Sequence, residues 1–324
     1  HKVVHQVVFA GHRREYAFDT AGFFVPADVL EPERDLVFVH HCPDIGEGPY
    51  RGYTRSMPEL PEVETVRRGL APAMEGKRIL RVETRRKDLR FPFPENFNQR
   101  IEGARIRHLG RRAKYLVGEL SSGEALIMHL GMTGRFTVEG KKPGKFHHEA
   151  GDSDKHDHVV FGMQGGATIT FNDARRFGFM DLAATADINA HSAFDGLGIE
   201  PLDGELTPEF LAAAAHGKKT DLKAFLLDQR IVAGLGNIYV CEALFRSGVS
   251  PTKLAGAIKR DKLEKLSIEI RKVIEEAIEA GGSTISDFET TTGELGYFQH
   301  RFQVYDREGD ACLVCTKPVK RLVQ

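Results

Sequence analysis

The 324-residue sequence has little net charge, few cysteines and no long apolar run. A net charge of −1 gives no general basic signature for nucleic acid, so any nucleic-acid-binding face must be local. Without a run of about eighteen apolar residues or a signal-peptide pattern, the chain is expected to be soluble and intracellular. The four cysteines allow several disulfide pairings, but the Cys312-Leu313-Val314-Cys315 spacing in a chain without secretion signals favours half of a metal site.

Residues 1–56 differ in character from the rest of the chain. They carry five of the fourteen histidines, and four prolines interrupt short apolar pieces such as Val7 to Ala10 and Leu36 to Val39. No sustained helical or strand period emerges. A zinc role for the run 40–42 (His-His-Cys) is disfavoured, because adjacent residues in an extended chain point to opposite faces. We predict that residues 1–56 are an extension that is not part of the working protein.

A helix is predicted after Met57, because apolar residues recur at helical spacing from Leu60 to Leu70. Glu59 and Glu62 lie near its beginning. The ordinary interpretation is a proline-started helix with acidic residues at its positive end. The alternative is chemical. If translation began at Met57 and the methionine were removed, Pro58 would expose a secondary amine, a nucleophile able to form an iminium with a sugar carbon.

The remaining pattern predicts an α+β protein with two main parts. Residues 57–188 read as an N-terminal domain in which the first helix packs on an antiparallel β-sandwich or flattened barrel. Residues 189–205 read as a hinge, residues 206–282 as a helical domain, and residues 283–324 as a loop followed by two strands around the cysteine pair, Tyr297 to Tyr305 and Lys317 to Val323. The predicted sandwich strands are Ile79 to Thr84, Tyr115 to Leu120, Ala125 to Leu130, Arg135 to Glu139, Val159 to Met163 and Ala167 to Phe171. The predicted helices start at Thr207-Pro208-Glu209 and continue through Leu222 to Gln229, Ile238 to Phe245 and Leu263 to Ala280.

A series of short motifs carries a specific resemblance. They stand in order at residues 58–64, 67–69, 112–116, 129–134, 155–158, 173–178, 234–239 and 312–315. In content and order they resemble the formamidopyrimidine-DNA glycosylases, bifunctional repair enzymes for oxidised purines. The resemblance covers residues 57–324 and implies a sandwich domain, a helix–two-turn–helix domain and a zinc ribbon.

The resemblance implies a catalytic set. Pro58 would attack the anomeric carbon of the damaged nucleotide, Glu59 would be the acid at the sugar ring oxygen, and Lys114 would serve the elimination step and contact a phosphate. Taken alone, Lys114 could instead be a solvated charge at the start of a strand.

The resemblance also implies DNA-contacting residues. A flipped-out nucleotide leaves a hole in the duplex, which Met132, Arg175 and Phe177 would fill, although each residue type is also common as an ordinary core or surface side chain. The implied phosphate contacts are His156, Arg175, Lys218 and Asn237. The implied lesion-pocket residues are Glu62, Lys223 and Glu242, and residues 284–297 correspond to a loop that closes over the extruded base.

Two features depart from the family pattern. The family ends in a four-cysteine zinc ribbon, whereas only Cys312 and Cys315 are present here, so one structural zinc ion would find half of its ligands. With residues 1–56 attached, Pro58 has no free amine, so the active species is expected to begin at Pro58.

Three functions therefore compete. The leading one is a glycosylase and lyase acting, as a monomer in the bacterial cytoplasm, on double-stranded DNA with oxidised purines opposite cytosine. An endonuclease VIII-like enzyme for oxidised pyrimidines is the nearest alternative, although Leu60 and the set Met132, Arg175 and Phe177 fit the purine branch better. The third is an inactive protein that binds lesion-containing DNA.

Overall fold

The computed structural model describes residues 5–9, 12–18, 24–26, 57–139, 153–283 and 297–321. The chain forms two compact units, one mainly of residues 1–49 and the other of residues 50–320. In the first unit, β1 (His5–Phe9), β2 (His12–Phe18) and β3 (Phe24–Pro26) form an antiparallel sheet in that order. The apolar piece Val7 to Ala10 overlaps β1, whereas residues 36–42 lie outside the described residues.

Helix α1 (Leu60–Met74) begins where the apolar spacing predicts. Leu60, Val63, Val66, Leu70 and Met74 are all buried along one side of the helix. A capping box defines the start of the helix, and in it the Glu59 N–H donates to the Glu62 carboxylate at 3.0 Å. The two acids therefore have defined places at the beginning of the helix.

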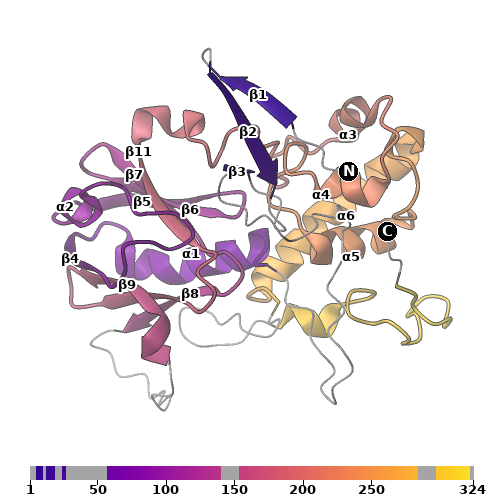
Figure 1. The fold of residues 1–324 in the computed structure, drawn as a ribbon. Coiled ribbons are helices and arrows are strands. Elements are labelled where there is room, and N and C mark those ends of the chain that lie inside the picture. The colour runs from indigo at the N-terminus through magenta and orange to yellow at the C-terminus, as the bar shows by residue number, and fades with distance from the viewer. Residues whose placement is uncertain are drawn as a thin grey trace, which may run out of the picture. The chain divides into compact units, whose positions relative to one another are not determined.

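Two four-stranded antiparallel sheets form a sandwich, which resolves the choice between sandwich and barrel (Figure 1). One sheet has the order β4-β9-β10-β8 and the other β11-β7-β6-β5. Their apolar faces and one side of α1 enclose a core that includes Leu70, Leu109, Phe136 and Phe161. The strands are β4 (Ile79–Thr84), β5 (Ile106–Arg112), β6 (Tyr115–Leu120), β7 (Glu124–His129), β8 (Gly134–Glu139), β9 (Asp157–Met163), β10 (Thr168–Asp173) and β11 (Phe179–Ala184).

The six predicted strands are present, but β5 and β11 were not predicted. These two are the edge strands of one sheet. In β5, only Ile106 and Leu109 are buried while the arginines of the strand are partly or fully exposed, so the strand lacks the alternation that marks a half-buried strand. Short elements complete this domain: the helix α2 (Phe97–Ile101) and the 3₁₀ helices η2 (Ser153–His156) and η3 (Thr185–Ala190).

The helical domain follows a short linker and has the predicted helices. They are α3 (Pro208–Ala215), α4 (Leu222–Leu227), α5 (Asn237–Ser247), the 3₁₀ helix η4 (Ala255–Ala257) and α6 (Arg260–Glu279). Thr207 Oγ1 accepts the Phe210 N–H at 3.1 Å, which confirms the predicted N-cap. Among the described residues, no helix is both long and apolar enough to cross a bilayer.

The strand predicted over Tyr297 to Tyr305 is wrong. The segment contains a 3₁₀ helix, η5 (Phe298–Arg301), followed by turns. Phe298, Phe302 and Tyr305 pack against α5 and α6, and the backbone N–H groups that a strand partner would need bind the Glu242 carboxylate instead. No strand forms over Lys317 to Arg321 either. A narrow hairpin is present there, with a single bridge between Ala311 and Pro318.

Candidate active site

Glu59 lies where the starts of two helices meet. Its carboxylate accepts hydrogen bonds from the backbone N–H groups of Ile238 (Oε1, 2.9 Å) and Tyr239 (Oε2, 3.5 Å), in the first turn of α5. Glu59 is 2% exposed, and the neighbouring Pro58 is also buried. Free N–H groups at a helix N-terminus favour an anion. The start of α5 therefore holds the side chain that follows the candidate nucleophile.

Two glycines allow the loop before α5 to approach this close. A Cβ on Gly236 would lie 2.3 Å from Glu59 Cδ, and a Cβ on Gly234, where φ is +88°, would lie 2.7 Å from Leu60 Cδ1. The Leu60 N–H donates to the Gly234 carbonyl at 3.1 Å. These glycines admit the start of α1.

Lys114 is the third member of the predicted catalytic set, and the structure places it where the charges of Glu59 and Glu62 act on its amine. It is 9% exposed and follows Ala113 in the turn between β5 and β6. Burial lowers the pKa of its amine, and the two carboxylates oppose that shift. A lowered pKa favours the neutral amine, which is the form that a proton-abstracting lysine needs.

The pKa of the Glu59 carboxyl is shifted in the opposite direction. Burial raises its pKa from 4.5 to about 7, Glu62 raises it further, and Lys114 and the α5 N–H groups work against the rise. A carboxyl group that is half-protonated near neutrality can both donate and accept a proton. Glu59 and Lys114 therefore form a pair in which each group is moved towards the pH at which it can exchange protons.

Glu62 has polar partners on three elements. Its Oε1 accepts from the Tyr239 hydroxyl at 2.5 Å, the Ser283 N–H at 2.9 Å and the Ser283 hydroxyl at 2.7 Å, and its Oε2 accepts from Glu59 N–H. Sequence reasoning placed Glu62 in the lesion pocket but missed Tyr239 and Ser283. Tyr239 was within reach, since it closes the 234–239 motif, but no signal marks Ser283.

The three residues predicted to fill the DNA void, Met132, Arg175 and Phe177, lie on two neighbouring loops. Met132 is half-buried, whereas Arg175 and Phe177 are exposed. The Arg175 guanidinium lies 4.6 Å from the centre of the Phe177 ring, a cation–π arrangement. An exposed arginine stacked on an exposed aromatic ring is a surface suited to bases.

Asp173, which sequence reasoning did not single out, joins these two loops. Its carboxylate is fully buried and accepts from the Gly178 N–H at 2.8 Å and from the Thr133 hydroxyl. Thr133 Oγ1 in turn accepts the Arg175 N–H at 3.1 Å. Asp173 stands within a quoted motif, so its position was available, but its role depends on contacts across about forty residues of sequence.

The other predicted DNA contacts are spread over several elements. His156 ends η2 and is half-buried, Lys218 follows α3 and is exposed, and Asn237 is the exposed first residue of α5. Lys223, on α4, is half-buried beside the Cys241 thiol, whose pKa is raised by burial. Their contacts with DNA remain predictions.

Glu242 has a structural environment. It is fully buried, and its carboxylate accepts four hydrogen bonds of 2.9 to 3.1 Å from the backbone N–H groups of Gln303, Val304 and Tyr305. These contacts hold the C-terminal segment to α5. The predicted place of Glu242 in the lesion pocket remains a prediction.

Cys312 and Cys315 lie on the tip of the C-terminal hairpin. The Cys312 N–H donates to the Lys317 carbonyl at 2.8 Å, and the Val314 N–H donates to Cys312 Sγ at 3.5 Å. Backbone N–H groups of Cys315 and Val314 lower the pKa of the Cys312 thiol. Amides directed at a thiolate suit a zinc knuckle, although no cluster of three or more metal-ligating side chains occurs among the described residues.

A β-sandwich joined to helices, with a proline–glutamate pair buried against a glycine loop, defines the class of helix–two-turn–helix DNA glycosylases. Comparison with known families agrees. Residues 57–180 match the formamidopyrimidine-DNA glycosylase N-terminal domain, and residues 197–289 match the H2TH domain of the same enzymes. The chain belongs to the formamidopyrimidine-DNA glycosylase family, and is thus a DNA glycosylase and AP lyase of base-excision repair.

Individual relatives support the assignment. The chain is 56% identical over 270 residues to formamidopyrimidine-DNA glycosylase of Ruegeria pomeroyi, covering 83% of this chain and 95% of the relative. It is 55% identical over 280 residues to the enzyme of a Bradyrhizobium species, covering 83% and 96%. The crystal structure of MutM (Fpg) from Thermus thermophilus superposes with a TM-score of 0.71 at 37% identity, over 82% of this chain and 94% of that one.

Proposed function

We propose that this chain, once it begins at Pro58, removes 8-oxoguanine and formamidopyrimidines through an imine on the Pro58 nitrogen and then cleaves the strand by β- and δ-elimination. The observation that carries the proposal is the buried Glu59 carboxyl, which lies next to Pro58, is held by the start of α5 and interacts with Lys114. These are an acid and an amine beside a nucleophile, as base removal and elimination require.

Each proposed chemical step is assigned to Pro58, Glu59 or Lys114. The Pro58 amine bonds to C1′ as the sugar ring C–O bond breaks, and protonated Glu59 gives its proton to the ring oxygen. The base leaves with the C1′–N bond electrons and a proton, and an iminium remains. Loss of a proton from C2′ to the Lys114 amine then expels the 3′-phosphate, and a second elimination expels the 5′-phosphate.

The peptide bond between Met57 and Pro58 controls this chemistry. As an amide, the Pro58 nitrogen has no lone pair available for attack, so the glycosylase step requires the chain to begin at Pro58. The family match begins at residue 57, and relatives that align over 95% or more of their own length cover 83% of this chain. These two findings support a working enzyme without residues 1–56.

The partner is double-stranded DNA that carries the lesion, bound by one monomer in the bacterial cytoplasm. A mutant of Fpg from Lactococcus lactis, 30% identical with a TM-score of 0.71, has been crystallised with DNA containing Fapy-dG. Met132, Arg175 and Phe177 fill the space left by the flipped nucleotide, and the Arg175 guanidinium can hydrogen-bond an orphaned cytosine. His156, Lys218 and Asn237 contact phosphates, while Glu62 and Lys223 face the lesion. Cys312 and Cys315 supply two of the four ligands of a structural zinc ion.

Borohydride trapping tests the proposal. A protein that starts at Pro58 and one that carries residues 1–56 are each mixed with a duplex containing 8-oxoguanine opposite cytosine and reduced with borohydride. We expect a covalent protein–DNA product only from the protein that starts at Pro58. A product from the extended protein, or none from the trimmed one, contradicts the proposal; lesion binding by the trimmed protein without cleavage would identify an inactive binding protein.

Oxidised pyrimidines are a second candidate substrate class. The Lactococcus lactis enzyme has also been crystallised with DNA containing an oxidised pyrimidine, which supports some tolerance in the family. Release of 8-oxoguanine and of thymine glycol should be compared on the same trimmed protein. We expect faster release of 8-oxoguanine, and the reverse order would place the chain with the endonuclease VIII-like enzymes.

A further inference from the structure

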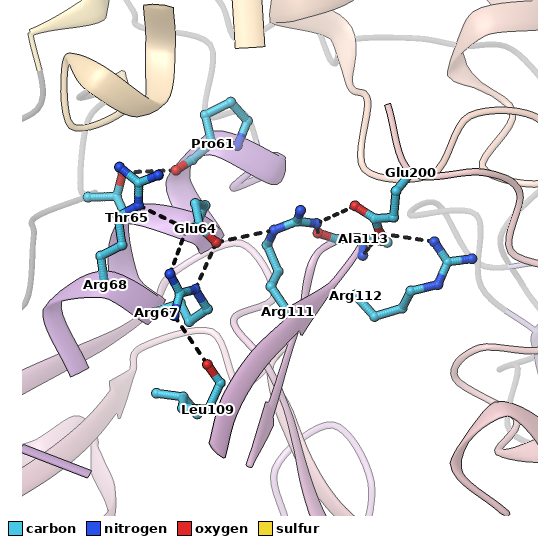
Figure 2. Close-up of polar contacts among 10 residues, drawn as sticks. All are labelled: Pro61, Glu64, Thr65, Arg67, Arg68, Leu109, Arg111, Arg112, Ala113 and Glu200. Carbon is cyan, nitrogen blue, oxygen red and sulfur yellow. Dashed lines mark hydrogen bonds and ion pairs between the residues drawn. The ribbon is translucent and has the colours of Figure 1, made fainter. Parts of the chain in front are cut away.

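Glu200, in the linker between the two domains, binds the turn that carries Lys114 (Figure 2). Its carboxylate is buried and accepts from the Ala113 N–H at 2.5 Å, from Arg112 Nη1 at 3.0 Å and from Arg111 Nη1 at 2.8 Å. None of these residues belongs to the predicted site.

The turn needs such support. Ala113 has φ of +50°, in the left-handed region that residues with a Cβ seldom adopt. Its N–H is bound by Glu200, and its carbonyl accepts from Arg111 Nη1 at 2.9 Å. Surrounding contacts must maintain a conformation of this kind. The orientation of Lys114, the next residue, follows from it.

Both arginines of the turn connect it to other elements. Arg111 Nε lies 3.5 Å from the carboxylate of Glu64 on α1, the helix that begins beside Glu59. Arg112 donates to the Gly198 carbonyl at 2.6 Å. The network therefore spans α1, the end of β5 and the linker, as Figure 2 shows.

The linker also pairs with the segment that leads to the glycine loop. The Gly198 N–H donates to the Gln229 carbonyl at 2.8 Å, and the Ala233 N–H donates to the Ile199 carbonyl at 2.8 Å. Residue 233 directly precedes the loop whose glycines lie against Glu59 and Leu60. Glu200 is thus fixed to the same backbone that positions the Glu59 partners.

We propose that Glu200 is a positioning residue for strand cleavage, which holds the Ala113 turn so that the Lys114 side chain stays buried and interacts with Glu59 and Glu62. The inference rests on the proposed role of Lys114 in elimination. If Glu200 were only part of a structural ion pair, its replacement would lower stability and would slow base release and strand cleavage alike.

The experiment compares Glu200→Ala and Glu200→Gln with Glu75→Gln in protein that begins at Pro58. Glu75 is a matched control, because its carboxylate also accepts a backbone N–H of β5, that of Leu109 at 2.9 Å, away from the turn. Base release from 8-oxoguanine DNA and cleavage of DNA with a preformed abasic site are measured separately under single turnover. Three ionisable groups interact electrostatically with Lys114, namely Glu59, Glu62 and His129, so cleavage is also followed across pH.

We expect Glu200→Ala to slow cleavage by about 10- to 100-fold and base release by no more than about threefold, as a small displacement of one reacting group would. The pH midpoint for cleavage by Glu200→Ala should rise, because burial lowers the pKa of the Lys114 amine and a less buried amine loses part of that shift. Glu200→Gln, whose amide oxygen still accepts the Ala113 N–H, should show a smaller change of the same kind, and Glu75→Gln should show none.

Equal slowing of both steps, or an unchanged midpoint, overturns the inference. If Glu200→Ala does not fold, Glu200→Gln decides by the same ratio and midpoint. Absence of trapping by the unsubstituted protein would instead overturn the proposed function, so the two failures are distinguishable.

Discussion

Two buried glutamates lie at helix α5, Glu59 at its start and Glu242 within it, and their surroundings differ. Glu59 reaches the start of the helix from α1 and accepts two N–H groups, one of them at 3.5 Å, next to a second acid, Glu62. Glu242 stands within the helix and accepts four hydrogen bonds from three consecutive N–H groups of the C-terminal segment. Few donors and a neighbouring acid leave a carboxyl free to exchange protons, whereas a complete set of donors makes it a structural support.

The two environments also differ in how closely the backbone approaches the carboxyl group. Gly236 lies so near Glu59 that a Cβ would reach within 2.3 Å of Cδ. Around Glu242 the approaching groups are amides of residues 303–305, which form a concave anion site. The Glu59 carboxyl thus lies where two domains meet, and Glu242 fastens the C-terminal segment onto the helical domain.

The largest expected effect comes from exchanging the Glu59 carboxyl for an amide. Glu59→Gln keeps an oxygen for the Ile238 N–H but cannot give up a proton, so excision of 8-oxoguanine should fall by about 100- to 10,000-fold in single-turnover assays. Glu242→Gln is the matched control and should change excision far less. A similar loss of excision in both variants would contradict this distinction between the two glutamates and would indicate that Glu242 contacts the lesion.

A smaller effect is expected from Glu242→Ala, and it should appear in stability. The substitution leaves the N–H groups of residues 303–305 without their acceptor, at a cost of about 2 to 4 kcal/mol for the C-terminal segment. Hydrogen exchange should show faster exchange at Gln303, Val304 and Tyr305 while the sandwich stays protected. Unchanged protection at these amides would contradict the structural role.

Much of this organisation was predictable from the sequence. The predicted sandwich strands are short β-rich runs separated by turn residues, Thr207 is a typical N-cap residue, and the motifs that carry the resemblance contain Glu59, Lys114 and Arg175. These features depend on residues close together in the chain, or on the family resemblance, so pattern alone could find them.

What the sequence did not predict depends on contacts between distant segments. The edge strand β5 is mostly polar and β11 is mostly apolar, so neither shows a regular alternation. The segment 297–305 was misassigned because Glu242, about sixty residues earlier, takes its N–H groups. Glu200 binds Ala113 from 87 residues away. A single carboxylate of this kind has no local pattern, since its partners are set by the packing of whole domains.

The smallest effect, and the one that most directly sharpens the comparison, is a pH dependence. The folded protein raises the Glu59 pKa from 4.5 to about 7, mainly by burial. Between these values the folded state holds a proton that the unfolded state has lost, so the contribution of Glu59 to stability is fully present below 4.5 and is lost as pH rises through about 7. Urea unfolding of the unsubstituted protein and of Glu59→Gln should show a stability difference that falls by at most about 3 kcal/mol across this window. Excision should decline above the same pH, because the acid is then ionised. A stability difference that stays constant with pH would mean that Glu59 is held as a carboxylate by the α5 N–H groups, like a purely structural acid.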